Sequence, residues 1–308
     1  MRDRRGFALL SAIWLVVAIA VAGLQLALET RRSTLAAINL THDVQARTAA
    51  SAAFDLTRAR VDQHLRRAAE SGPYEARLAL SDPWMSVDTA YSLTETFGVV
   101  DIHILIRSVG SQLNINRANE QEFLNFFIAL EFDYSTAEEL SQTIMDWRDT
   151  DDNYRARGAE RDFYVSEGLL NLPRNNLFES VGELRYVQGM TEDIFEIASP
   201  YLTVWGTGRI NLNTADFPVL MSLSGMTEAA ASYLISLREN GERLTATNQL
   251  QPYLASGRNL PNNRTAVTVD ELEIESLATA ADGRPILRGF GVIRRGTGQS
   301  TLTNWRVE

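Results

Sequence analysis

The spacing of apolar residues predicts that the chain begins with one unusually long helix. Residues 7–28 are almost all apolar, and about 22 such residues are enough to cross the hydrocarbon core of a membrane. No glycine or proline occurs between Leu24 and Ser71, where alanine, leucine, arginine, glutamate and glutamine dominate. We therefore predict a single helix from Phe7 to about Ser71, roughly 100 Å long, that ends at Gly72-Pro73.

Alternating apolar and polar residues predict strands on either side of a second helical region. From Phe97 to Ser108 the apolar residues share one face, and His103 lies on the other face as a solvated strand residue rather than a ligand. Strand character returns after Ala266, at residues 268–269, 286–294 and 302–307. The residues between these blocks have a helical pattern, so we expect a sheet that is interrupted by a helical insert.

The insert contains two internal repeats. The string at residues 113–119 (LNINRAN) recurs at residues 210–216 (INLNTAD), and Gly-Met-Thr-Glu occurs at residues 189–192 and 225–228. Glycine suits the turn after a helix and threonine suits the N-cap of the next helix, so the pattern predicts paired short helices like helix-hairpin-helix modules. Such modules bind DNA in other proteins, but here the second copy, at residues 225–228, is followed by no cation until Arg238, which favours a role in packing or protein contact.

Composition and charge exclude several classes of function. The 308 residues include no cysteine, and all 29 basic residues are arginine, so disulfides, zinc–thiolate sites, lysine Schiff bases and lysine-dependent phosphate loops are ruled out. The net charge of −10 argues against nucleic-acid binding through bulk electrostatics. The chain also has no Gly-x-Ser-x-Gly or His-Glu-x-x-His motif. We therefore expect that the protein is not an enzyme and has no catalytic residue.

The densest chemical pattern is an acidic segment that follows a predicted helix over residues 137–147. With Asp149 as the first position of a calcium loop, Asp151 falls at position three, Asn153 at five and Glu160 at twelve. The sixth position, which is normally glycine, is Tyr154. The spacing is consistent with a calcium site and equally with a solvated polar loop of arginine–carboxylate pairs, which would add little stability.

The first residues carry a recognisable leader pattern. Arg2, Arg4 and Arg5 precede Gly6, and a short arginine-rich start favours a cytoplasmic N-terminus. A secretory signal peptide is the alternative, but no small-residue cleavage site follows the apolar run. An arginine-rich leader, a glycine, Phe7 and an apolar helix together resemble a type IV prepilin or a type II secretion pseudopilin. The resemblance implies cleavage by a prepilin peptidase between Gly6 and Phe7, and methylation of the new N-terminus at Phe7.

One position departs from the usual pilin pattern. The fifth residue of the mature chain is usually a glutamate that pairs with the amino terminus of a neighbouring subunit, whereas here it is Ser11. A carboxylate in an apolar stretch needs a partner that offsets its desolvation. Its absence indicates a subunit that has no other subunit above it. A simple signal anchor with a helical stalk is the competing interpretation.

Several separated strings narrow the resemblance to one family. Residues 146–152 (DWRDTDD), 173–191, 199–204 and 211–215 resemble the K minor pseudopilins of type II secretion, the general secretion pathway protein K family. The resemblance implies an α+β fold, with a type IV pilin-like long helix, an antiparallel sheet and a large all-α insertion that contains the helix-hairpin-helix-like repeats. It also implies a structural Ca²⁺ ion, with ligands among Asp149, Asp151, Asp152 and Glu160 and extending to Asp146.

The same resemblance implies an organisation and a cellular role. We expect a leader at residues 1–6, a transmembrane half-helix at 7–28, a periplasmic stem at 29–72, a pseudopilin domain at 73–116 and 266–308, and the inserted helical domain at 117–265. The protein would span the inner membrane once, with its C-terminal domain in the periplasm. It would cap or initiate the pseudopilus that drives export across the outer membrane. Its partners would be the I and J minor pseudopilins, the other pseudopilins, the prepilin peptidase and the inner-membrane secretion platform, with no nucleic acid. The alternative is an anchored pilin-like protein that binds DNA or a surface.

Overall fold

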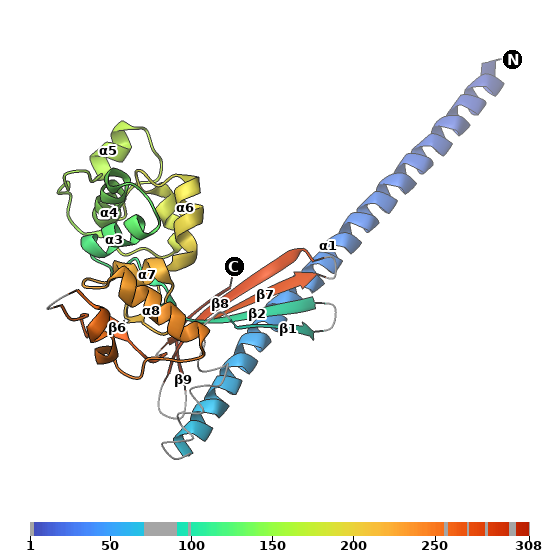
Figure 1. The fold of residues 1–308 in the computed structure, drawn as a ribbon. Helices are drawn as coiled ribbons and strands as arrows, with labels where there is room; N and C mark the ends of the chain where they lie inside the picture. Colours follow the sequence, from blue (N-terminus) through green and yellow to red (C-terminus); the bar gives the residue numbers. More distant parts are fainter. Residues whose placement is uncertain are drawn as a thin grey trace.

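One long helix supports an α+β architecture in the computed structural model, which describes residues 3–70, 91–97, 100–255, 258–269, 271–280, 283–295 and 300–307 (Figure 1). Helix α1 (Asp3–Glu70) runs for 68 residues, which confirms the predicted long helix. The predicted stop at Gly72-Pro73 lies outside the described residues. Among the described side chains of α1, those that pack on the rest of the chain lie in its second half, where small side chains such as Ala46, Ala50 and Ala53 are fully buried against the sheet.

The sheet has five antiparallel strands in the order β1-β2-β7-β8-β9. Its strands are β1 (Tyr91–Phe97), β2 (Val100–Ser108), β7 (Glu271–Ala280), β8 (Pro285–Arg295) and β9 (Ser300–Val307). On β2, Ile102, Ile104 and Ile106 are buried and His103 is exposed, as the alternation predicts. The prediction differs from the structure in three details: residues 268–269 are not in a strand, and neither β1 nor β7 was expected.

The helical region lies between β2 and β7 in the sequence and has a hydrophobic core of its own, separate from the one between α1 and the sheet. Its α-helices are α3 (Glu120–Ala129), α4 (Tyr134–Arg148), α5 (Arg161–Ser166), α6 (Glu192–Ala198), α7 (Phe217–Ser222) and α8 (Glu228–Glu239). Short 3₁₀ turns occur at η1 (Val109–Ser111), η2 (Val181–Tyr186), η3 (Ser199–Tyr201) and η4 (Thr247–Tyr253). Two parallel two-residue pairs complete the region: β3 (Leu113–Asn114) with β4 (Leu202–Thr203), and β5 (Ile210–Asn211) with β6 (Thr265–Ala266).

The repeated strings adopt the same local structure. In each copy a two-residue strand, β3 or β5, leads through a turn into a helix, α3 or α7. Both Gly189 and Gly225 have positive φ, and Thr191 and Thr227 accept hydrogen bonds from the backbone N–H groups of the following helices. The predicted glycine turns and threonine N-caps are therefore confirmed. The likeness to helix-hairpin-helix modules stays a prediction.

In each copy an asparagine side chain both donates a hydrogen bond to and accepts one from the backbone of a residue that is distant in the sequence. Asn116 accepts from the N–H of Phe178 and donates to its carbonyl, at 2.8 and 2.9 Å. Asn213, at the matching position of the second copy, makes the same exchange with Leu244, with both bonds at 2.9 Å. The repeat in the sequence is thus a repeat of tertiary contacts as well.

A loop between the two copies fixes the helical region to the sheet. The Trp205 ring stacks on the Phe290 ring of β8, with centroids 5.5 Å apart. The N–H of Thr207 donates to Glu271 at the start of β7, at 3.0 Å. Gly206 between them has a φ of 86°, and a Cβ there would press against Glu271 and Val109. The helical region is therefore attached at a third place besides its two connections along the chain.

Candidate metal centre

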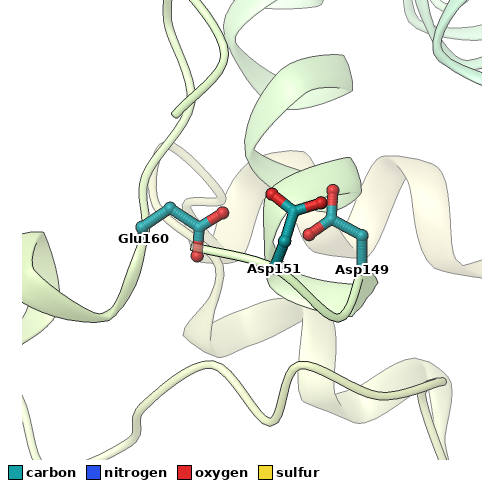
Figure 2. A group of neighbouring side chains, drawn as sticks. All are labelled: Asp149, Asp151 and Glu160. Atoms are coloured by element: carbon teal, nitrogen blue, oxygen red, sulfur yellow. The ribbon is translucent and has the colours of Figure 1, made fainter. Parts of the chain in front are cut away.

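The acidic segment connects the end of α4 to the start of α5. Asp149 is the C-cap of α4, where its N–H donates to the Met145 carbonyl at 3.0 Å. Glu160 is the N-cap residue of α5, but its side chain makes no capping bond. Instead its carboxylate faces those of Asp149 and Asp151, as Figure 2 shows, and one oxygen from each of the three lies within 4.8 Å of the others. The loop thus brings three hard oxygen donors to one place.

Burial leaves two of these carboxylates incompletely satisfied. Glu160 is only 1% exposed, and neither of its oxygens has a hydrogen-bond partner among the described residues. The Oδ1 atom of Asp149 is likewise buried and has no hydrogen-bond partner among the described residues. Burial, reinforced by the neighbouring carboxylates, raises the pKa of Glu160 to about 7. An unpaired buried carboxylate is costly, so this arrangement requires either a proton or a cation.

The two remaining predicted ligands lie outside this group. Asp146 is fully buried in the last turn of α4, and it accepts hydrogen bonds from the backbone N–H and the guanidinium of Arg155. Burial raises the pKa of Asp146, and Arg155 opposes that shift. Asp152 accepts from the side-chain amide of Asn175 at 2.9 Å. Of the five residues expected, the structure therefore brings Asp149, Asp151 and Glu160 together.

The loop departs from the standard calcium loop at two positions. The backbone N–H and the side-chain amide of Asn153 both donate hydrogen bonds to Asp151. Asn153 therefore orients a neighbouring carboxylate, whereas position five of the standard loop supplies a ligand of the ion. The chain does not turn sharply at Tyr154. It turns where the N–H of Gly158 donates to the Arg155 carbonyl at 3.0 Å.

Sequence reasoning missed one neighbour of the site, Asn175. Its Nδ2 atom donates to the Asp151 carbonyl at 3.2 Å, and its Oδ1 atom is buried without a partner in the described part of the chain. Asn175 also has a φ of 48°, which is uncommon for a residue other than glycine. An asparagine pair after a proline, at residues 173–176, is the sequence signal of such a turn.

The N-terminal candidate residues Gly6, Phe7 and Ser11 all lie on α1, whose side chains are described from Ala12 onward. Over the described residues α1 contains an 18-residue window of mean hydropathy 2.1, none of it buried, which is long and apolar enough to cross a membrane. Trp14, for example, is 71% exposed. The backbone and hydropathy of α1 are thus compatible with a single-span anchor.

A long helix packs against an antiparallel sheet, and a helical region is inserted between the neighbouring strands β2 and β7. The fold matches a chain of the crystal structure described as the GspK-GspI-GspJ complex from the enterotoxigenic Escherichia coli type 2 secretion system. The match has a TM-score of 0.63 and covers 87% of this chain and 99% of that chain, at 16% identity. Residues 103–207 match the family model for type II secretion system protein K.

Curated relatives carry the same family name. A putative type II secretion system protein K of Escherichia coli K12 is 32% identical over 132 residues, which cover 41% of this chain and 40% of the relative. Type II secretion system protein K of Pectobacterium carotovorum is 31% identical over 109 residues, or 33% of each chain. The matches therefore span two fifths or less of the relatives' lengths. The resemblance to type II secretion protein K that the sequence indicates is confirmed.

Proposed function

We propose that the protein is a K-type minor pseudopilin at the tip of a type II secretion pseudopilus. The observation that carries the proposal is α1, whose side chains from Ala12 to Leu28 are exposed and mostly apolar, while its C-terminal half packs on the sheet (Figure 1). In water such a face is unstable, because each large apolar side chain left exposed forfeits about 1.5–3 kcal/mol of burial. A membrane and neighbouring helices would cover it.

The face of α1 opposite the sheet suits a partner helix. At 100° per residue, Thr41, Thr48 and Ala52 point away from the buried Ala46 and Ala50, and all three are exposed. The hydroxyls of Thr41 and Thr48 donate to carbonyls one turn earlier, at 2.9 and 2.8 Å. Small side chains whose polar atoms are already bonded can be covered closely at little cost. We assign this face to the helices of the I and J minor pseudopilins, which the solved complex names as partners of its K protein.

Two features support a terminal position in the filament. Ser11 stands where a carboxylate would pair with a subunit above, and the helical region makes the head wide beside α1 (Figure 1). A head of this size does not fit a tight helical array of repeated subunits. In the proposed arrangement the filament grows from the membrane beneath this subunit and pushes secreted protein towards the outer membrane.

Immunogold electron microscopy of pseudopili tests this position. A C-terminal epitope on the full chain should label one end of each filament, and the same epitope on the major pseudopilin should label the whole length. Label from this chain spread along the shaft would refute the tip position.

Intact-mass analysis of the chain from its native membrane tests the processing. We expect a chain that starts at Phe7 with one extra methyl group. Gly6→Val, the matched control, should retain Met1. A wild-type chain that retains Met1 would refute pilin-type processing.

We propose in addition that Asp149, Asp151 and Glu160 hold a Ca²⁺ ion. Their oxygens fit a hard cation, because both oxygens of the buried Glu160 and the Oδ1 atom of the half-buried Asp149 have no partner among the described residues. A bound ion supplies positive charge that neutralises the cluster and cross-links the end of α4 to the start of α5. Waters and backbone carbonyls would complete the ligand set.

Isothermal titration calorimetry, in which calcium is added to the full chain in detergent micelles, tests the site. Glu160→Gln removes one anionic donor and should weaken binding at least about tenfold. Glu167→Gln changes an exposed glutamate at the opposite end of α5, where it is the C-cap residue, and should leave the affinity unchanged. No heat from the wild type, or equal affinity in Glu160→Gln, would refute the assignment.

A further inference from the structure

We infer that the buried Asp146 and the half-buried Arg155 form a positioning pair for the acidic loop, and that Asp146 is not itself a ligand of the ion. The inference rests on the proposed calcium site and concerns how that site is built. Asp146 is one of six carboxylates within residues 146–162, and spacing alone does not separate donors from supports. The hydrogen bonds around Asp146 do make that separation.

Both oxygens of Asp146 are already in use. Oδ1 accepts from the Nη1 atom of Arg155, and Oδ2 accepts from the backbone N–H of the same residue at 3.2 Å. The side chain of Asp146 is fully buried, so these bonds are shielded from water. Neither oxygen of Asp146 is therefore left over for an ion, whereas Asp149 keeps one buried oxygen without a partner in the described part of the chain.

The same arginine orients one of the proposed ligands. Nη1 of Arg155 lies 2.6 Å from Oδ2 of Asp149, while Oδ1 of Asp149 is buried and has no partner within the described ranges. Arg155 therefore holds one oxygen of Asp149 and leaves the other for the ion. Its Nε atom lies 3.6 Å from Glu120 on α3, which ties the loop to a second helix.

The pair also fixes the turn that returns the chain to the site. A Cβ atom on Gly158 would overlap Oδ2 of Asp146, so only glycine lets the backbone pass this close. The N–H of Gly158 donates to the Arg155 carbonyl, and Glu160 follows two residues later. The turn of the loop at Gly158 thus packs directly against Asp146. In a standard calcium loop a glycine at the sixth position makes the sharp turn; here that position is Tyr154, and the turn is made at Gly158 instead.

Terbium luminescence separates a positioning residue from a ligand. Tb³⁺ replaces Ca²⁺ at oxygen sites, and its lifetimes in H₂O and D₂O count the waters bound to the ion. In the full chain, Asp151→Ala should raise that count by about one, because water takes the place of a lost ligand. Asp146→Ala should instead weaken binding about tenfold or more, with the water count of the saturated ion unchanged.

Arg155→Lys distinguishes geometry from charge. Lysine keeps the positive charge but lacks the planar fork that contacts both aspartates, so binding should weaken as it does in Asp146→Ala. A higher water count in Asp146→Ala, or wild-type affinity in both variants, would overturn the positioning role alone. Failure of the wild type to bind either ion would overturn the calcium proposal, and the positioning role with it.

Discussion

Asn213 offers a sharp test of how the second copy of the repeat is held together. It is 5% exposed, accepts from the N–H of Leu244, and donates to the carbonyls of Leu244 and Val267 at 2.9 and 2.8 Å. These bonds join the turn after β5 to the segments that follow α8 and β6. Asn213→Ala removes the three bonds and adds no new group to satisfy the backbone.

The expected loss follows from the three backbone groups left behind. A typical hydrogen bond contributes about 1 kcal/mol net, and a buried group left unpaired costs about 1–3 kcal/mol. We therefore expect Asn213→Ala to lower the free energy of unfolding by about 3–5 kcal/mol. Asn116→Ala is the matched control: it breaks two bonds at a half-buried position where water can replace the amide, so about 1–2 kcal/mol is expected.

Urea unfolding of the full chain in non-ionic detergent, followed by tryptophan fluorescence and far-ultraviolet circular dichroism, measures both losses. The two asparagines belong to one helical region with one core, so the variants should report on the same cooperative unit. If Asn213→Ala cost no more than Asn116→Ala, burial of the hydrogen-bonded amide would not be the source of stability. The structural equivalence of the two copies would then have no energetic counterpart.

Three further outcomes are expected. With calcium chelated, the folded state should be more stable at pH 5 than at pH 8 by up to about 3 kcal/mol. The reason is that the pKa of Glu160 is raised to about 7, so folding favours the protonated carboxyl. This stability is lost as the pH rises through 7. Thermal melts across this pH range should show the slope, and calcium should flatten it; a flat profile without calcium would contradict the argument. Gly158→Ala should cost about 2–4 kcal/mol in urea unfolding and weaken calcium binding, since its Cβ would overlap Asp146, whereas Gly182→Ala has room and should be near neutral. Trp205→Ala should speed amide hydrogen exchange in β8, measured by mass spectrometry, because it removes an aromatic stack of about 1 kcal/mol; unchanged exchange would mean that the loop does not hold the sheet.

Elements with strong local patterns were predictable from the sequence. The length of α1 follows from the absence of helix breakers, and β2 follows from strict alternation. Strand β7 was missed because its glutamates have low strand propensity, and their partners are arginines on other strands. Glu273, for instance, pairs with Arg107 on β2, although the two are far apart in the chain. A pattern read from a short stretch of sequence cannot show a pairing between residues so far apart.

The site was predictable to a similar depth. Loop spacing placed Asp149, Asp151 and Glu160 at the first, third and last positions, and these are the three carboxylates that converge. Spacing does not show that Asp146 is engaged by Arg155, because that pairing depends on where the chain turns. Which carboxylates of the acidic segment pair with an arginine, and which are left to face the ion, depends on the path of the folded backbone.

The place where the chain leaves and re-enters the sheet has an evolutionary consequence. Strands β2 and β7 are antiparallel neighbours, and Ser108 at the end of one pairs with Leu272 at the start of the other. In sheet terms the two form a hairpin whose turn has been replaced by residues 109–270. An insertion at such a point leaves every ladder of the five-stranded sheet intact, so the inserted region is free to change in size and content while α1 and the sheet keep their form. The same gap should accept heads of other sizes and other contents.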